Sequence, residues 1–211
     1  MRSWRADIDK QAITNAVSHI ESLSAIELVV VVRRRSRAWP HIPFIAGGLA
    51  VWITLALMLF TAPAFSLASF LVDPFLVGAI VGWAASRVSE MIRWLTPSSA
   101  RRRAVDAAAN DTFVAHRVHG TRRRTGVLVY CALGERMASV VVDAGVATAV
   151  APDRLGAWRD QIGAAIGQGP HAVANAVAAM APVFAAALPR LHDDENELAD
   201  AVTVDLGSLQ L

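Results

Sequence analysis

Cysteine, tyrosine and lysine are almost missing from this chain of 211 residues, which contains one of each. The single cysteine, Cys131, excludes an internal disulfide and a CxxC metal or redox pair. Charged residues make up only 18% of the chain and hydrophobic residues 55%, which excludes a disordered chain and a basic tail that coats nucleic acid. No Walker loop, GxGxxG run, HExxH motif or GxSxG elbow occurs in the sequence. A composition this apolar predicts a membrane protein and indicates no particular reaction.

Two long stretches of the chain carry almost no charge. Residues 42–60 have no formal charge, and a helix of that length measures about 28 Å, close to the hydrocarbon core of about 30 Å. The second predicted span lies within residues 67–86, where Asp73 is the one charged residue. Proline is well tolerated in a first helical turn, and a carboxylate at the bilayer centre costs about 2.5–3.5 kcal/mol. We therefore expect Asp73-Pro74 to mark the start of the second span, near the membrane surface.

Arginines flank the two predicted spans and are missing from the connection between them. Residues 61–72 contain no Lys or Arg, whereas these arginines stand on the outer flanks: Arg33, Arg34, Arg35, Arg37, Arg87, Arg93, Arg101, Arg102 and Arg103. The positive-inside rule then predicts that both termini lie in the cytoplasm. Residues 1–10 are polar, so we expect no cleaved signal peptide.

Further features of the predicted hairpin point to lipid and to helix packing. Trp39 and Trp94, at the outer flanks of the spans, fit an interfacial aromatic belt, and residues 87–95 are expected to form a short interfacial helix. Gly78 and Gly82 have a small-xxx-small spacing that allows a second helix to approach closely.

The remaining sequence predicts an α/β domain. Apolar periodicity indicates helices, and continuous β-branched runs indicate buried strands. In chain order these are helix 7–24, strand 26–32, helix 99–118, strands 125–132 and 137–142, and helices 152–166 and 170–188 with a kink at Pro182. The first strand precedes the hairpin and its expected partners follow it, so the hairpin is predicted to be an insertion. We therefore divide the chain into domain residues 1–37, hairpin 38–97, domain residues 98–189 and an acidic, loosely held tail 190–211.

The order of these segments resembles the TPM-domain family, also called the thylakoid lumen phosphatase-like domain. The motifs that match are Thr125-Gly126-Val127-Leu128-Val129, Glu135-Arg136-Met137, Asp143-Ala144-Gly145-Val146 and a helix that carries Trp158. The resemblance covers residues 7–32 and 104–189 and is greatest to the bacterial membrane branch, in which a two-span insertion follows the first strand. It implies a small α/β sandwich interrupted by a transmembrane helical hairpin, in the bacterial inner membrane.

The resemblance also bears on activity. Roles in the repair or assembly of membrane complexes, and as auxiliary subunits of membrane proteins, are attributed to the family, and weak acid phosphatase activity and metal binding are attributed to a photosynthetic branch. Here Arg124-Thr125-Gly126 stands where the photosynthetic and secreted branches carry Asp-Asn-Gly, and a later acidic, glycine-rich segment is reduced to Asp143 and Gly145. These changes remove carboxylates that a metal or phosphoryl site needs. We therefore predict no catalytic, cofactor-binding or metal-ligating residues.

The remaining candidates for such sites have simpler interpretations. His116 and His119 are spaced as two ligands on one helix face, but no further ligand accompanies them, and histidines near a helix C-terminus favour its dipole. Glu135 and Asp143 lie at opposite ends of a predicted strand and are not expected to meet. The acidic run at residues 193–197 is interpreted as a solvated tail.

The run Arg122, Arg123 and Arg124 is the most ambiguous feature. Anionic lipid headgroups are its favoured ligand because they are the nearest negative charge to a domain tethered at a membrane, and an acidic protein partner is the alternative. Nucleic acid is not expected, because no aromatic residues are interleaved with the arginines.

The sequence as a whole favours a non-enzymatic accessory or assembly protein with no cofactor. Its predicted partners are the membrane, which it spans twice, anionic lipid, and a larger membrane complex or a second copy of itself. The alternative is a weak phosphatase-like hydrolase with a degenerate site.

Overall fold

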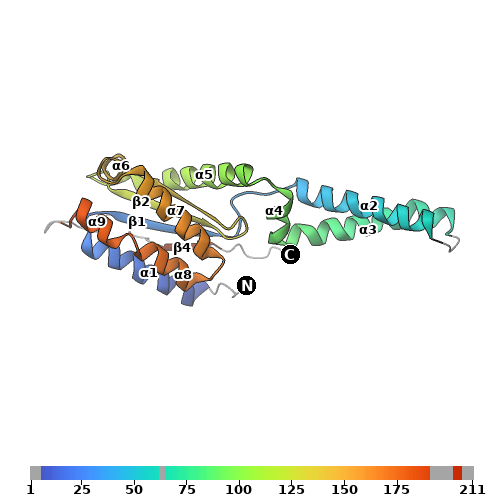
Figure 1. The fold of residues 1–211 in the computed structure, drawn as a ribbon, viewed down its shortest axis with the longest axis horizontal. Coiled ribbons are helices and arrows are strands. Elements are labelled where there is room, and N and C mark those ends of the chain that lie inside the picture. The colour runs from blue at the N-terminus through green and yellow to red at the C-terminus, as the bar shows by residue number, and fades with distance from the viewer. Residues whose placement is uncertain (1–5, 62–64, 191–201, 206–211) are drawn as a thin grey trace. The chain divides into compact units, whose positions relative to one another are not determined.

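The computed structural model describes residues 6–61, 65–190 and 202–205 and separates into two compact units (Figure 1). Unit 1 contains residues 1–37 and 101–211, and unit 2 contains residues 38–100. Unit 2 therefore interrupts unit 1 in the sequence. The chain leaves unit 1 after Arg37 and returns to it at Arg101.

Unit 1 is a mixed α/β unit, as the sequence predicts, built on one four-stranded sheet. The strands are β1 (Glu27–Arg33), β2 (Gly126–Ala132), β3 (Met137–Val142) and β4 (Val202–Asp205), in the order β3-β2-β1-β4. β1 is parallel to both β2 and β4, and β3 runs antiparallel to β2. The parallel register joins Glu27 to Gly126 and Arg33 to Ala132. Strands separated by the whole of unit 2 in the sequence are thus direct neighbours in the sheet.

β4 corrects the prediction of a loosely held tail over residues 190–211. Val202–Asp205 pairs in parallel with the second half of β1, from Val30 to Arg33. Val202 and Val204 pack in the same core. Every second side chain of β4 therefore faces the core, as in a half-buried strand, although β4 has only four residues. The acidic run at residues 193–197 lies outside the described residues.

Helices cover both faces of the sheet because side chains alternate between the faces along each strand. On one face Leu28, Val30 and Val32 of β1 pack in a core built mainly with α1 (Ala6–Leu23), α7 (Pro152–Ile166), α8 (Pro170–Ala178) and α9 (Ala181–Ala187). On the other face Val29 and Val31 pack in a smaller core with α5 (Ser98–Ala115). Figure 1 shows α5 on the side of the sheet opposite to α1, α8 and α9.

The helices of unit 1 follow the predicted segments closely, with three differences. The long C-terminal segment breaks between α8 and α9 at Ala179 and Met180, near the kink expected at Pro182. α5 ends at Ala115 and is followed by a short 3-10 turn, η1 (Val118–Gly120), with Arg117 in the left-handed conformation between them. A short helix that the sequence reasoning missed, α6 (Ala144–Ala149), follows β3 directly.

Unit 2 is a helical hairpin followed by a short helix. α2 (His41–Phe60) and α3 (Leu67–Arg87) form the hairpin, and α4 (Ser89–Leu95) follows a break at Val88. The expectation that α3 begins at Asp73-Pro74 is wrong. Ser66 caps the helix by accepting a hydrogen bond of 3.1 Å from the backbone N–H of Ser69, so Pro74 lies inside the helix.

Three segments are long and apolar enough to cross a membrane, judged by length and composition: His41–Phe60, Leu67–Arg87 and Pro170–Ala187. The third segment contributes Val173, Val177 and Phe184 to the core of unit 1, each with no exposed surface. The first two form the hairpin, and most of their large apolar side chains are exposed.

Candidate interaction surfaces

The two long helices of unit 2 pack closely against each other at glycine residues. A Cβ atom added to Gly47 would lie 2.8 Å from the backbone oxygen of Gly78, and one added to Gly82 would lie 2.7 Å from that of Pro43. Only hydrogen at these positions allows such an approach. The predicted close helix packing at Gly78 and Gly82 is present, and the helix that they meet is α2 of the same chain. Neither glycine is left to contact a partner helix.

The outer surface of the hairpin is strongly apolar. Phe44 is 79% exposed, Trp52 75% and Leu71 71%, values that are unusual for large apolar side chains in contact with water. Exposed apolar side chains occur along the whole length of both helices, which makes the surface a continuous patch of the kind that binds lipid or another protein.

The two tryptophans that the sequence assigns to a membrane interface differ in exposure. Trp94 is 84% exposed, whereas Trp39 is buried and packs edge-to-face on the His41 ring with centroids 5.8 Å apart. His41 in turn lies 3.0 Å from the Thr96 hydroxyl, measured from Nε2 to Oγ1. Trp39 thus belongs to the packing within unit 2, and of these two tryptophans only Trp94 is exposed to lipid or a partner.

Arg35 and Arg101, which lie on either side of the hairpin in sequence, come together at one end of unit 1, around the turn between β2 and β3. Glu135 in this turn has no exposed surface, and its Oε1 accepts hydrogen bonds from the backbone N–H of Ser36 at 3.1 Å and the Ser36 hydroxyl at 2.8 Å. Its carbonyl oxygen accepts a bond of 2.9 Å from Arg101. One residue therefore fixes the segment that leaves unit 1 and the segment that returns to it.

The arginines of unit 1 that flank the hairpin in sequence, here called the junction arginines, differ in what they contact. They are Arg33, Arg34, Arg35, Arg37, Arg101, Arg102 and Arg103. Burial and the charge of Arg34 lower the pKa of Arg35, and the Glu135 carboxylate opposes that shift. Arg33 lies 3.9 Å from the Asp205 carboxylate at the end of β4, with both side chains about half exposed. Arg34 and Arg103 are exposed. Arg33, Arg34, Arg37 and Arg103 are thus the exposed junction arginines.

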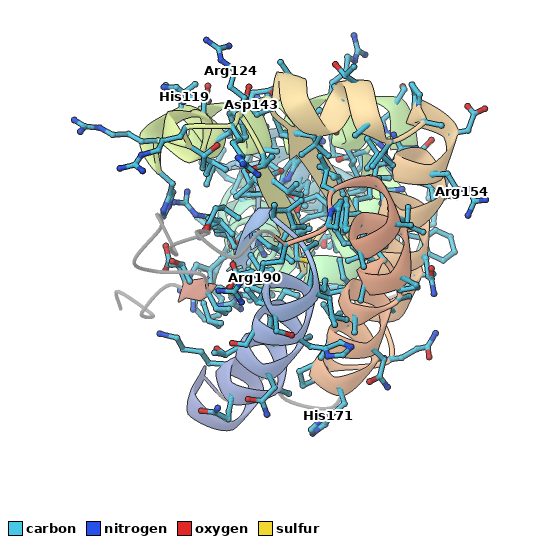
Figure 2. All side chains as sticks on the ribbon, turned by 90° about the vertical axis from the view of Figure 1, so that its left-hand side faces the viewer. His119, Arg124, Asp143, Arg154, His171 and Arg190 are labelled. Carbon is cyan, nitrogen blue, oxygen red and sulfur yellow. The ribbon has the colours of Figure 1, made fainter. Side chains whose placement is uncertain are left out.

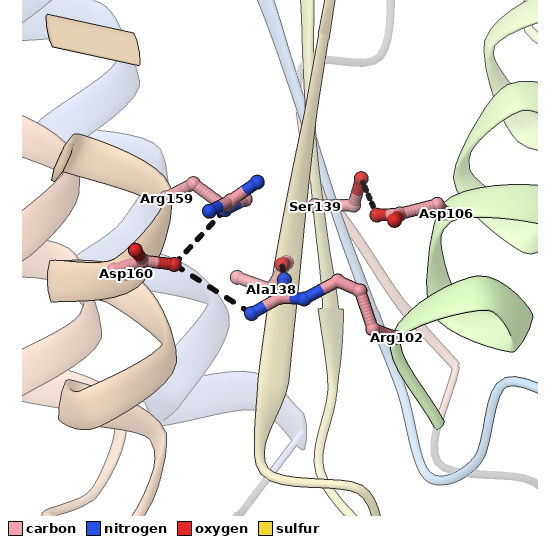
Figure 3. A network of polar contacts seen from close by, with 6 residues as sticks. All are labelled: Arg102, Asp106, Ala138, Ser139, Arg159 and Asp160. Carbon is pink, nitrogen blue, oxygen red and sulfur yellow. Dashed lines mark hydrogen bonds and ion pairs between the residues drawn. The ribbon is translucent and has the colours of Figure 1, made fainter. Parts of the chain in front are cut away.

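Arg102 belongs to a polar network that joins three layers of unit 1 (Figure 3). It donates a 2.7 Å hydrogen bond to the Ala138 carbonyl of β3 and lies 3.5 Å from the Asp160 carboxylate of α7. A hydrogen bond from Arg159 lowers the pKa of Asp160. Beside this group, Asp106 of α5 accepts a 2.8 Å bond from the Ser139 hydroxyl. Arg102, which belongs to α5, therefore connects this helix to β3 and to α7.

Arg122, Arg123 and Arg124 lie at the opposite end of the sheet, before β2 begins. All three are exposed, and Figure 2 shows Arg124 pointing away from the ribbon. The backbone N–H groups of Arg124 and Thr125 bond to the carbonyl and hydroxyl oxygens of Thr121 at 3.1 and 3.0 Å, and Arg124 has a φ of 54°. These bonds form a fixed turn that presents the three guanidinium groups to solvent.

The first turn of α6 packs against this arginine turn. Gly145 donates a 3.0 Å bond to the Arg124 carbonyl, and a Cβ atom there would lie 2.7 Å from the carbonyl oxygens of both Arg123 and Arg124. The Asp143 carboxylate caps α6 through a 2.7 Å bond from the N–H of Ala144. Since β2 has seven residues, the turn lies about 23 Å from the junction end of the sheet.

Two titratable groups elsewhere in unit 1, Cys131 and Glu21, have pKa values that burial raises. Burial raises the pKa of the Cys131 thiol from 9.0 to about 12, which removes its nucleophilic form at neutral pH. Burial also raises the pKa of Glu21 from 4.5 to about 7, opposed by the hydrogen bond that its Oε1 accepts from the Leu28 N–H. The nearby Glu27 raises this pKa further and Arg190 lowers it. Within residues 6–61, 65–190 and 202–205, no group of three or more His, Cys, Asp or Glu is placed to hold a metal ion.

The importance of Glu135 and Glu21 does not follow from the sequence. Glu135 lies at the opposite end of β3 from Asp143, so the two carboxylates do not form a pair. A glutamate in a tight turn gives no sign that it is buried, and only the parallel pairing of β1 and β2 brings Ser36 to it.

Comparisons with known proteins show similarity of fold alone. No protein-family model and no curated protein matches the sequence. A solved NMR structure of the BA42 protein from the psychrophilic bacterium Bizionia argentinensis is similar to this chain, with a TM-score of 0.57 and 15% sequence identity over 97% of each chain.

Proposed function

We propose that this chain is a non-enzymatic accessory protein of the bacterial inner membrane, in which the hairpin spans the bilayer and unit 1 docks on a cytoplasmic partner. The observation that carries the proposal is the exposed apolar surface of α2 and α3, exemplified by Phe44, Trp52 and Leu71. Burying such a surface in lipid stabilises it by about 25 cal/mol for each Å² removed from water.

The length of the helices agrees with a membrane-spanning role. α2 has 20 residues and α3 has 21, which corresponds to about 30 Å each, the thickness of the hydrocarbon core. The arginine distribution supports cytoplasmic termini, because no Lys or Arg lies between Arg37 and Arg87.

The two groups of arginines support different roles. The exposed junction arginines, Arg33, Arg34, Arg37 and Arg103, adjoin the segments that connect to the hairpin, where anionic headgroups would be close. The Arg122–Arg124 turn lies about 23 Å from the junction end of the sheet, measured along β2 within unit 1. We propose an acidic surface of the protein partner as one ligand of this turn, beside the anionic headgroups that the sequence favours.

The resemblance of the sequence to the TPM-domain family supports an accessory role for unit 1, and on this ground we propose that unit 1 is TPM-like. The alternative from the same resemblance, a weak phosphatase-like hydrolase, is disfavoured because arginine replaces the expected carboxylate before Thr125-Gly126. The buried Cys131 thiol and the capping role of Asp143 agree with a structural use of these side chains.

Cysteine labelling tests the membrane topology. Cys131 is buried and gives a silent background, so single cysteines can be introduced at Thr61 in the connection and at Gln168 in unit 1, both exposed. In intact spheroplasts an impermeant maleimide should label Thr61→Cys and reach Gln168→Cys only after permeabilisation. Equal labelling of both positions, or release of the protein by alkaline carbonate, would refute the membrane assignment.

Tagged purification of the full-length chain in mild detergent tests the docking role. A stoichiometric membrane complex should co-elute, and replacing Arg122, Arg123 and Arg124 by glutamine should reduce its recovery at least tenfold. Arg154→Gln, which removes an exposed arginine from α7, serves as the control and should leave recovery unchanged. A solitary protein, or equal losses in both variants, would contradict the role of the turn.

A further inference from the structure

An aspartate interrupts the apolar face of α3 that points away from α2. Pro74, Gly78, Gly82 and Ala85 form the buried side of this helix. At 100° per residue, positions 73, 76, 80 and 83 lie on the other side. Leu76 and Ile80 are both 58% exposed and Trp83 is 61% exposed, and Asp73 is exposed beside them. No hydrogen bond or ion pair within the described part of the chain holds the Asp73 carboxylate.

The carboxylate lies within the apolar length of the hairpin. Asp73 follows the first residue of α3, Leu67, by six positions, which is about 9 Å along the helix axis. If α3 spans the bilayer, as the proposed function requires, this depth is inside the hydrocarbon region. Carboxylates at such depths usually pair with an opposite charge on a neighbouring helix.

The chain itself offers no cation to Asp73. No Lys or Arg occurs between Arg37 and Arg87, and the one histidine in that interval is His41. The contacts of Gly47 with Gly78 and of position 82 with Pro43 set the antiparallel register, which puts Asp73 level with Trp52. His41 is eleven residues from that point, or about 16 Å along α2.

A second copy of the chain offers no cation either. Copies inserted with the same orientation carry Asp73 at the same depth, so contact between these faces would bring like charges together. We propose that the outward face of α3 (Asp73, Leu76, Ile80 and Trp83) docks a transmembrane helix of a different protein that carries a Lys, Arg or His side chain at the depth of Asp73. This inference rests on the proposed function and names the partner's chemistry.

Photocrosslinking of the full-length chain in its native host tests the inference. A benzophenone amino acid placed at position 76 lies one turn from Asp73 and should crosslink to one transmembrane segment of another protein. Sequencing of the crosslinked peptide should find a Lys, Arg or His within one helical turn of the attachment point. Asp73→Asn should reduce the crosslink at least tenfold, Asp73→Glu should retain it, and Ile80→Ala on the same face should change it less than threefold.

Each other outcome overturns the inference. A crosslink only to a second copy, only to lipid, or to a helix without a cation would show that Asp73 recruits no basic partner. An undiminished crosslink in Asp73→Asn would show that the charge is not recognised. Carbonate extraction of the same cells separates the two proposals: release of the chain refutes the membrane assignment, whereas retention with any of these results refutes only the docking inference.

Discussion

Neighbouring glycines in α2 provide a matched test of how the hairpin is held together. Both Gly47→Ala and Gly48→Ala gain the same helix propensity, about 1 kcal/mol, so this term cancels in their difference. A Cβ atom at Gly48 meets nothing within 4 Å, whereas one at Gly47 meets the Gly78 oxygen at 2.8 Å. To restore an ordinary contact the two helices must separate by about 0.5 Å, which weakens dispersion contacts along the interface. We expect Gly47→Ala to be less stable than Gly48→Ala by about 1–3 kcal/mol, the usual effect of overpacking.

The assay is reversible unfolding of the purified full-length chain in mild detergent by SDS titration, followed through tryptophan fluorescence. Trp52 and Trp83 lie on the hairpin and report its separation. Gly82→Ala should behave as Gly47→Ala does, because its Cβ atom would lie 2.7 Å from the Pro43 oxygen. Equal midpoints for the variants at positions 47 and 48 would refute the close packing of α2 on α3.

Three further predictions concern unit 1. Glu135→Ala should lower the free energy of unfolding by about 2–4 kcal/mol, because it removes the buried acceptor of both Ser36 donors, whereas Ser36→Ala should cost about 1 kcal/mol; similar values in urea unfolding would contradict the anchoring role of Glu135. Between pH 4.5 and about 7 the folded chain keeps a proton on Glu21 that the unfolded chain has released, so the unfolding free energy should fall as pH rises through this window. The fall is about 1–2 kcal/mol after allowance for the partial exposure of the carboxyl, and a slope that persists in Glu21→Gln would assign it to another group. Cys131 should resist maleimide at pH 8 in the folded chain and react within minutes in denaturant; rapid labelling of the native protein would show that its strand opens.

Much of the fold follows from simple patterns in the sequence. Residues 42–60 and 67–86 predict the hairpin helices because apolar runs of that length with at most one charge have few other uses. The β-branched runs before Arg33 and Ala132 predict β1 and β2 for a similar reason, since strands buried on both faces lose the alternation of polar and apolar residues. Composition alone therefore carries much of the information where burial is complete.

The errors occur where tertiary contacts decide between weak local signals. Val202–Asp205 is too short for its alternation to stand out, and it becomes a strand because β1 has a free edge beside it. Pro74 suggests a helix start, yet the Ser66 cap begins α3 earlier. The spacing of Gly78 and Gly82 shows that one face of α3 carries small residues. The spacing does not identify which helix packs against this face.

The position of the arginines within unit 1 explains how one residue type can serve two purposes. At the junction end, Arg101 and Arg102 donate hydrogen bonds to the carbonyls of Glu135 and Ala138, so changing them should disturb stability before it disturbs binding. At the other end, the Arg122–Arg124 turn is shaped by backbone bonds to Thr121, and its side chains are exposed. The glutamine variants of this turn should therefore unfold within about 0.5 kcal/mol of the parent chain while losing the partner. A binding defect accompanied by a large loss of stability would instead show that the turn supports the fold.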